Sequence, residues 1–363
     1  MSQPPFKIYW GLLPFALLYG LGVGLRNRLF DKGILTSKEF PLPVICIGNI
    51  SVGGTGKTPH TEYLIRLLRK SYRIAVLSRG YKRKSKGFVL AQPDTPIEAI
   101  GDEPFQMSRK FPDIYVAVDR DRCHGISQLT DEITAPGVEA ILLDDAYQHR
   151  YVKPGLNILL IDYHRPIQED KLLPAGRLRE SPDGKKRADI LIISKCPPHL
   201  DTECRQQFRK ALSPLPHQSL YFTTLAYGKL RLLFTEGPER TLETLTPEEH
   251  LLVVTGIASP TPLLEELSRY TRHVHPLTFG DHHDFNETDL HRIEEMFLRL
   301  PGPQKSIVTT EKDAARGLSE TLKPYFYVLP IEVRFLNHEE ESFNQQIIAY
   351  VRKNSRNSCL SKG

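Results

Sequence analysis

Short apolar runs alternate with amphipathic segments through the first two thirds of the chain. The first run opens residues 44–59, and others cover 72–78, 114–118, 138–145, 157–162 and 188–196. Residues 61–70 carry apolar side chains at helical spacing between the first two runs. A strand, a helix and a second strand in this order indicate a parallel sheet, so the pattern predicts an α/β fold.

The last third repeats this alternation over a shorter length. Strands are predicted at residues 251–256, 275–279, 306–310 and 325–329, and helices at 262–270 and 287–300. Residues 219–226 and 230–234 flank a Tyr-Gly-Lys turn and predict a hairpin. The expected division is a core domain over 33–218, a hairpin linker over 219–238, a second α/β domain over 239–352 and a disordered polar tail over 353–363.

The amino-terminal segment has a different pattern. Residues 8–25 carry no charge, and Arg26, Arg28 and Lys32 follow at once. A spanning helix needs roughly 20 apolar residues, while Pro14 and four glycines weaken a helix here. We expect residues 1–32 to associate with a membrane through an apolar helix, its basic flank on the cytoplasmic side; a buried core helix is the alternative.

Composition narrows the class of protein only slightly. The 363 residues suffice for two domains, and 48 basic against 43 acidic residues give a net charge of +5, too mild to imply nucleic acid. The five cysteines form no C-x-x-C pair. Their spacing argues against a disulfide framework or a zinc site and favours a reducing compartment.

The turn after the first apolar run has the composition of a phosphate-binding loop. Three glycines stand within four residues, followed by Lys57 and Thr58. Such a loop points backbone N–H groups at polyphosphate, lysine reaches the β- and γ-phosphates, and the threonine hydroxyl binds magnesium. Ser51 stands where the strict pattern has glycine, and an ordinary glycine-rich turn is the alternative. The residues expected to bind the nucleotide are Ser51, Val52, Gly53, Gly54, Thr55, Gly56, Lys57, Thr58 and Arg79.

Acidic and basic residues follow other predicted strands. Asp144 and Asp145 end the run at 138–145, as expected of the acidic magnesium partner of a phosphate loop. Five cations crowd residues 78–87, either in a solvated loop or as a grip on phosphate. Residues 194–197, Ser-Lys-Cys-Pro, lack the carboxylate that reads guanine, so ATP is the expected nucleotide.

Two further acidic motifs are ambiguous when taken alone. Asp102 and Glu103 precede a helix predicted over 105–110, where carboxylates commonly cap the helix. Residues 281–284, Asp-His-His-Asp, suit either an exposed loop or a metal.

Several motifs together resemble those of the tetraacyldisaccharide 4'-kinases, which phosphorylate the lipid A precursor. The similar stretches lie in family order at residues 48–59, 78–81, 101–104, 173–180, 281–283 and 309–314. The family usually has Gly-Phe where this chain has Ala146-Tyr147, so the local turn is expected to differ while both aspartates remain.

The resemblance implies transfer of the ATP γ-phosphate to the 4'-hydroxyl of a tetraacylated glucosamine disaccharide 1-phosphate, at the cytoplasmic face of an inner membrane. It implies ATP and Mg²⁺ as cofactors and the lipid precursor and membrane surface as partners, with no nucleic acid or obligate protein partner. By family likeness Asp102 and His282 are the base and its partner, expected in different lobes that close together, and Glu180 lies near the metal or phosphates.

A second class of function fits the same loop. Membrane-cycling ATPase switch proteins of the deviant phosphate-loop group share Gly-Gly-Thr-Gly-Lys-Thr, but they carry an early lysine where this chain has Val52. Partner-stimulated ATP hydrolysis with no labelled lipid product would favour that class.

Overall fold

The computed structural model describes residues 7–355 except 236, 258, 282, 317 and 319. The chain divides into two compact units. Unit 1 comprises Met1–Thr95, Met107–Leu225 and Val333–Gly363, and unit 2 comprises Pro96–Gln106 and Ala226–Glu332. The predicted tail over 353–363 lies largely outside the described residues.

The sheet of unit 1 has nine strands in the order β14-β8-β7-β6-β1-β5-β2-β4-β3. The neighbours from β8 to β4 are parallel, and β3 is antiparallel to β4. The strands are β1 (Val44–Gly48), β2 (Ile74–Ser78), β3 (Val89–Leu90), β4 (Tyr115–Val118), β5 (Ala140–Asp144), β6 (Leu156–Asp162), β7 (Ile190–Ser194), β8 (Ser219–Tyr227) and β14 (Ile331–Phe335). This arrangement confirms the parallel α/β fold that the alternating pattern predicts.

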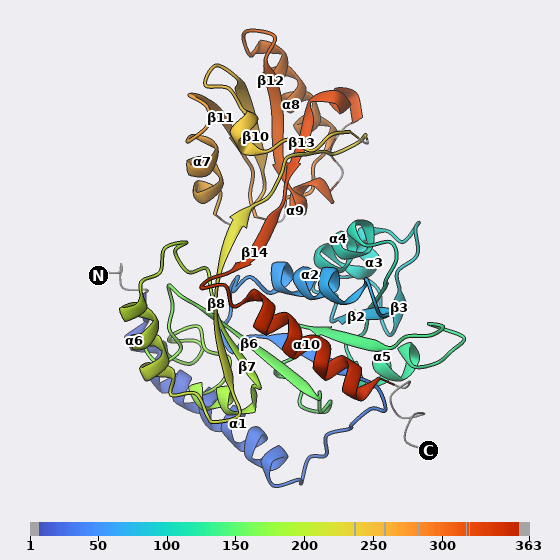
Figure 1. Cartoon of the computed structure of the whole chain (residues 1–363), viewed down its shortest axis with the longest axis vertical. Coiled ribbons are helices and arrows are strands. Elements are labelled where there is room, and N and C mark those ends of the chain that lie inside the picture. The colour runs from blue at the N-terminus through green and yellow to red at the C-terminus, as the bar shows by residue number, and fades with distance from the viewer. Residues whose placement is uncertain are drawn as a thin grey trace. The chain divides into compact units, whose positions relative to one another are not determined.

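Both faces of this sheet are buried, which explains why its strands are apolar throughout rather than alternating. Val44 and Cys46 of β1 enter one core, and Ile45 and Ile47 enter the other. The first core includes side chains of α5 (Arg122–Leu129) and α6 (Thr202–Leu212). The second includes side chains of α2 (Lys57–Leu68), α4 (Asp102–Lys110) and α10 (Glu340–Asn354), the last crossing in front of the sheet in Figure 1.

Unit 2 has its own five-stranded sheet in the order β11-β10-β12-β13-β9. The first four strands are parallel, and β9 is antiparallel to β13. Helices α7 and α8 contribute to the cores on its opposite faces. The elements are β9 (Arg231–Leu232), β10 (His250–Thr255), α7 (Thr261–Leu267), β11 (His273–Thr278), α8 (Glu287–Arg299), β12 (Lys305–Thr310) and β13 (Phe326–Leu329).

The remaining elements are short, apart from α1. They are η1 (Trp10–Leu12), α1 (Leu13–Asp31), α3 (Ile97–Ile100), η2 (Pro182–Arg187), η3 (Leu242–Thr244), α9 (Glu311–Ala314) and η4 (Glu320–Tyr325).

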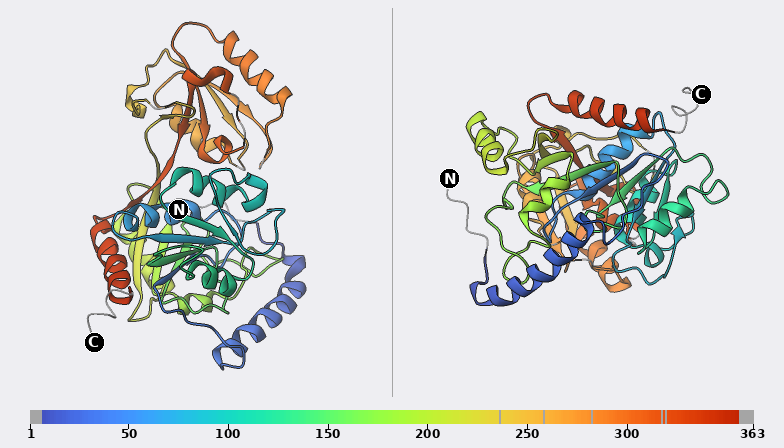
Figure 2. Two further views of the ribbon diagram at one scale, coloured as in Figure 1. Left: turned by 90° about the vertical axis from the view of Figure 1, so that its right-hand side faces the viewer. Right: turned by 90° about the horizontal axis from the view of Figure 1, so that it is seen from below.

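Helix α1 confirms a helix in the apolar segment but not a membrane span. It lies along the outside of unit 1 in both views of Figure 2. Its side chains Phe15, Leu17, Leu18, Leu21 and Leu25 are all exposed. Within the described part of the chain, no helix combines the length and the hydropathy needed to cross a bilayer.

The predicted domain boundaries need correction. Strand β8 pairs with β7 in unit 1, whereas β9 pairs with β13 in unit 2, so residues 219–238 do not form a hairpin. Helix α10 packs on the unit 1 sheet although 239–352 was predicted as one domain. Residues 96–106 belong with unit 2, so Asp102 and the segment around position 282 share a unit rather than lying in different lobes. Adjacency in sequence predicts such pairings poorly because the chain leaves unit 1 and returns to it.

Candidate nucleotide-binding site

The phosphate loop connects the buried strand β1 to helix α2, as the sequence predicts. Gly53 has φ 114° and Gly56 has φ 79°, a region where a side chain is strained. Gly56 is the N-cap of α2, so the loop ends where the positive end of the helix dipole begins. The glycines therefore permit a backbone turn that places the helix N-terminus at the loop.

Contacts from distant segments hold the loop in shape. The Val52 N–H donates to the Arg177 carbonyl at 2.7 Å, and the Arg179 N–H donates to the Ile50 carbonyl at 2.7 Å. Within the loop, Asn49 Nδ2 donates to Thr55 Oγ1 at 2.8 Å. A loop fixed in this way needs little reorganisation when it binds a ligand.

A buried histidine supports the loop from the first turn of α2. His60 Nδ1 lies 2.7 Å from the Gly56 carbonyl, and its Nε2 lies 3.0 Å from Thr223 Oγ1 on β8. Burial lowers the pKa of His60 to about 4, so the ring is neutral at pH 7. The carbonyl can only accept, so Nδ1 carries the proton and Nε2 accepts from the Thr223 hydroxyl. Ser194 Oγ at the end of β7 also donates to the Thr55 carbonyl, at 2.9 Å.

Lys57 and the aspartates of β5 meet beside the loop. Lys57 Nζ lies 3.7 Å from Asp145 Oδ1, and Arg179 Nη1 lies 3.1 Å from the same oxygen. Asp144 is 1% exposed and accepts from Thr61 Oγ1 of α2 at 3.0 Å. The loop, its lysine and the acidic strand end therefore come together as the sequence predicts.

Glu180 is a buried carboxylate with donors on both oxygens. Asn27 Nδ2 of α1 donates to Oε2 at 3.1 Å, and Gln148 Nε2 donates to Oε1 at 3.0 Å. Arg187 binds both oxygens at 2.9 Å. Burial lowers the pKa of Arg187, but the bond to Glu180 outweighs this, and the net shift is upward. Glu180 thus joins α1, the turn after β5 and η2.

Arg122 is a charged residue near this site that sequence reasoning missed. Its side chain is buried, and both burial and the charge of Arg79 lower its pKa, while Asp145 and Asp144 oppose that shift. Arg79 itself is exposed directly after β2. The position of Arg122 in the sequence, shortly after the predicted strand that is β4, could have marked it as a site residue, because ligands bind at the carboxyl ends of parallel strands.

The basic loop after β2 is partly structural. Arg83 donates to the Val118 carbonyl at 3.3 Å and to the Gly87 carbonyl at 2.6 Å. This arginine therefore holds the loop closed, so the expected five-cation grip on phosphate has at most four members.

Asp102 is the first residue of α4. It lies in the part of this helix, up to Gln106, that belongs to unit 2, and Arg316 binds it at 2.7 Å. The Arg316 side chain is 1% exposed and also pairs with Asp313 at 3.2 Å. His282, the predicted partner of Asp102, lies outside the described residues. The neighbouring His283 Nε2 lies 2.8 Å from Asp289 Oδ2.

The fold and the loop define the class of protein: a phosphate-loop nucleotide-binding protein with a parallel α/β core. The family model for tetraacyldisaccharide-1-P 4'-kinase matches residues 8–352. The chain therefore belongs to the tetraacyldisaccharide 4'-kinase family, and it is a kinase, a transferase of lipid A biosynthesis.

Relatives and a solved structure agree with this assignment. The chain is 58% identical to the tetraacyldisaccharide 4'-kinase of Phocaeicola vulgatus, with 98% of each chain covered. It is 54% identical to that of Bacteroides fragilis, over 99% of this chain and 98% of the relative. The structure of LpxK from Aquifex aeolicus in complex with ATP is 29% identical, with a TM-score of 0.72, over 94% of this chain and 99% of that one.

Proposed function

We propose that this chain transfers the γ-phosphate of ATP to the 4'-hydroxyl of a tetraacylated glucosamine disaccharide 1-phosphate. The observation that carries the proposal is the braced phosphate loop with Lys57 beside Asp145, in a chain of this kinase family. The ATP complex of the Aquifex aeolicus structure supports ATP as the donor. Phosphoryl transfer needs positioning and charge stabilisation more than covalent chemistry, and a rigid cationic loop supplies both.

The residues of the loop divide the binding of the nucleotide between them. Backbone N–H groups between Ser51 and Gly56, apart from that of Val52, which donates to the Arg177 carbonyl, cradle the phosphates, and the Lys57 ammonium stabilises charge on the transferred group. Arg79 supplies a further cation for a phosphate of the nucleotide or of the acceptor.

Magnesium fits the oxygen donors at this place. The Thr58 hydroxyl and the Asp144 and Asp145 carboxylates are hard ligands on the elements that usually hold it. These residues would hold the ion, which when bound would neutralise charge on the phosphate oxygens. Glu180 remains a candidate for an outer contact, although Asn27, Gln148 and Arg187 already bind its oxygens.

Asp102 is the proposed base for the attacking hydroxyl, with His282 as its partner. The assignment rests on family likeness, and the ion pair with Arg316 orients the carboxylate. Because proton transfer is late in a loose transition state, a strong base is not required.

Helix α1 is proposed to bring the enzyme to its acylated substrate at the cytoplasmic face of the inner membrane. Its exposed leucines and Phe15 form an apolar surface, and Arg26 and Arg28 follow. Exposed apolar side chains beside a basic flank favour attachment at the boundary between headgroups and acyl chains.

The deciding experiment incubates the protein with γ-labelled ATP and the detergent-dispersed lipid A disaccharide precursor. Label in the lipid supports the proposal, and a precursor lacking the 4'-hydroxyl should stay unlabelled. Rapid release of labelled inorganic phosphate without labelled lipid would instead favour the ATPase switch.

A further inference from the structure

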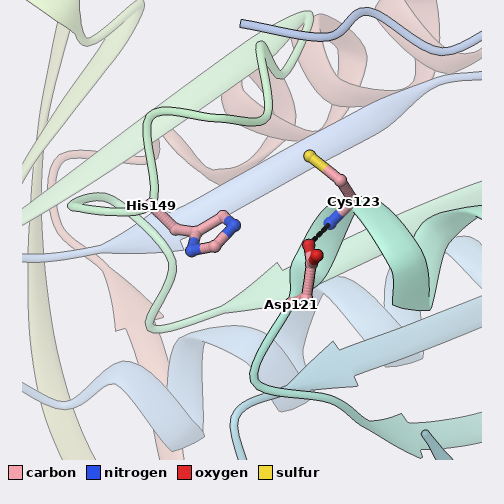
Figure 3. A group of neighbouring side chains, drawn as sticks. All are labelled: Asp121, Cys123 and His149. Atoms are coloured by element: carbon pink, nitrogen blue, oxygen red, sulfur yellow. Dashed lines mark hydrogen bonds between the residues drawn. The ribbon is translucent and has the colours of Figure 1, made fainter. Parts of the chain in front are cut away.

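Asp121, Cys123 and His149 form a cluster of potential metal ligands in unit 1, separate from the magnesium residues proposed above. Asp121 is the N-cap of α5, Cys123 lies in its first turn, and His149 follows β5. One ligand atom from each lies within 4.8 Å of the other two, and among the described residues no other group of three meets this condition. Figure 3 shows the imidazole of His149 pointing a ring nitrogen toward Asp121 and Cys123.

The backbone holds the carboxylate in place. Asp121 Oδ1 accepts from the Cys123 N–H at 2.9 Å and from the His124 N–H at 3.2 Å. These bonds fix the side chain, and each carboxylate oxygen has two lone pairs, so coordination capacity remains.

The imidazole is in the state that a metal requires. Its Nε2 is buried and has no hydrogen-bond partner among the described residues. Burial, together with the charge of Arg122, lowers the pKa of His149 to about 4, so the ring is neutral at pH 7. A buried nitrogen without a partner is costly, and a bound ion would remove that cost.

The thiol must lose its proton to bind a metal. Cys123 Sγ donates to the Tyr151 carbonyl at 3.3 Å, a bond from a weak donor that a metal bond would replace. Burial raises the pKa of this thiol, so binding should release one proton and strengthen as pH rises.

The ligand set selects the kind of ion. Thiolate, imidazole and carboxylate together suit Zn²⁺, whereas Mg²⁺ and Ca²⁺ prefer oxygen alone. All three residues line a cavity of about 960 Å³, which leaves a fourth position open to water. Thiolate and carboxylate together offset the +2 charge of the ion, which matters because Arg122, Arg26 and Arg79 lie close enough to affect His149.

We propose that Asp121, Cys123 and His149 bind one Zn²⁺ ion with an open fourth position. The cluster escapes a search for C-x-x-C spacing because two ligands come from one helix start and the third from the turn after another strand. A bound ion would tie the start of α5 to the segment that follows Asp144 and Asp145.

Cobalt substitution tests the site without relying on activity. The full-length protein, stripped of metal in detergent, is titrated with Co²⁺, which gives a thiolate-to-cobalt charge-transfer band when sulfur is a ligand. We expect one equivalent to saturate the band, Zn²⁺ to abolish it and excess Mg²⁺ to leave it unchanged.

Single-residue variants test which side chains bind the Co²⁺ that gives the charge-transfer band. Cys123→Ser should remove it and His149→Gln should weaken Co²⁺ binding at least about tenfold, since even indirect supports of a metal site cost that much. Cys204→Ser is the matched control, because Cys204 is another partly exposed thiol, and it should keep the full band. Thermal unfolding confirms that each variant is folded. No band in the unmodified protein, or a band that persists in Cys123→Ser, overturns the proposal.

Discussion

Both units contain parallel sheets, yet they use charged side chains differently where strands end. In unit 1, Lys57, Asp145 and Arg179 keep 12%, 30% and 28% of their side-chain surface exposed. In unit 2, Arg316 is 1% exposed and held by Asp102 and by the fully buried Asp313. Partly exposed charges can exchange partners for a ligand, whereas a buried pair is costly to separate. The first arrangement suits ligand binding, and the second fixes the position of one carboxylate.

Arg316→Met gives the largest expected effect. It leaves the Asp313 carboxylate buried without its guanidinium partner. Removing one partner of a buried ion pair lowers the free energy of unfolding by about 3–5 kcal/mol. Hydrogen exchange of peptides from β10 and β12 should speed up accordingly. Lys312→Met is the control, because Lys312 is 42% exposed and lies 3.7 Å from Glu103. Equal protection in both variants would mean that Arg316 is not a structural centre of unit 2.

Lys57→Ala is the corresponding test of unit 1. It removes the charge that we propose faces the transferred phosphate, so kcat/KM should fall about 10²–10³-fold while thermal unfolding stays nearly unchanged. Lys153→Ala serves as control, since this lysine is 65% exposed and pairs with an exposed glutamate. Activity retained by Lys57→Ala would remove the phosphate-loop assignment.

Asp102→Asn separates a base from a structural carboxylate. Asparagine keeps the shape and can still accept a bond from Arg316, but it is not a base, so kcat should fall about 10²-fold with ATP affinity little changed. Glu103→Gln, at the next position, should be nearly normal. Near-normal turnover by Asp102→Asn would move the base elsewhere, with Asp144 the next residue to test.

The glycines of the loop allow folding and ligand approach to be distinguished. Gly56 has φ 79°, so Gly56→Ala should cost about 1–2 kcal/mol of stability. A Cβ on Gly54 would meet nothing within 4 Å, so Gly54→Ala should fold normally. If the loop binds phosphate closely, Gly54→Ala should nevertheless raise the Kd for ATP in a calorimetric titration. Unchanged ATP affinity in that variant would place the phosphates away from Gly54.

Local features of the site were predictable from the sequence, and long-range supports were not. The strand, the glycines and Lys57 are adjacent in sequence, and Asp144 and Asp145 end an apolar run, so the pattern alone predicts that they lie together. The structure confirms this for Lys57 and Asp145, and their roles in binding stay predictions. Ser194 of β7 bonds to the loop at Thr55, and Thr223 of β8 contacts His60, which supports the loop. Arg316 reaches Asp102 across 214 positions. Helix α10 shows the same limit, because an amphipathic pattern predicts a buried face but not which sheet covers it.

The smallest expected effect concerns the link between α1 and the site. Asn27 of α1 donates to the buried Glu180, which also binds Gln148, and Gln148 Nε2 in turn donates to the Asn49 carbonyl beside the loop at 2.7 Å. Asn27→Ala removes one hydrogen bond, whose net contribution to stability is about 1 kcal/mol. Because this bond supports Glu180 and, through Gln148, the residue beside the loop, we expect kcat to fall several-fold.

A change on the exposed surface of α1 separates this effect from membrane binding. Leu21 is 70% exposed, so Leu21→Ser should weaken sedimentation with anionic phospholipid vesicles and leave kcat on detergent-dispersed lipid unchanged. Asn27→Ala should show the reverse: normal sedimentation with a lower kcat in detergent. If both variants lost only vesicle binding, α1 would serve as an attachment alone, and the contact with Glu180 would not contribute to turnover.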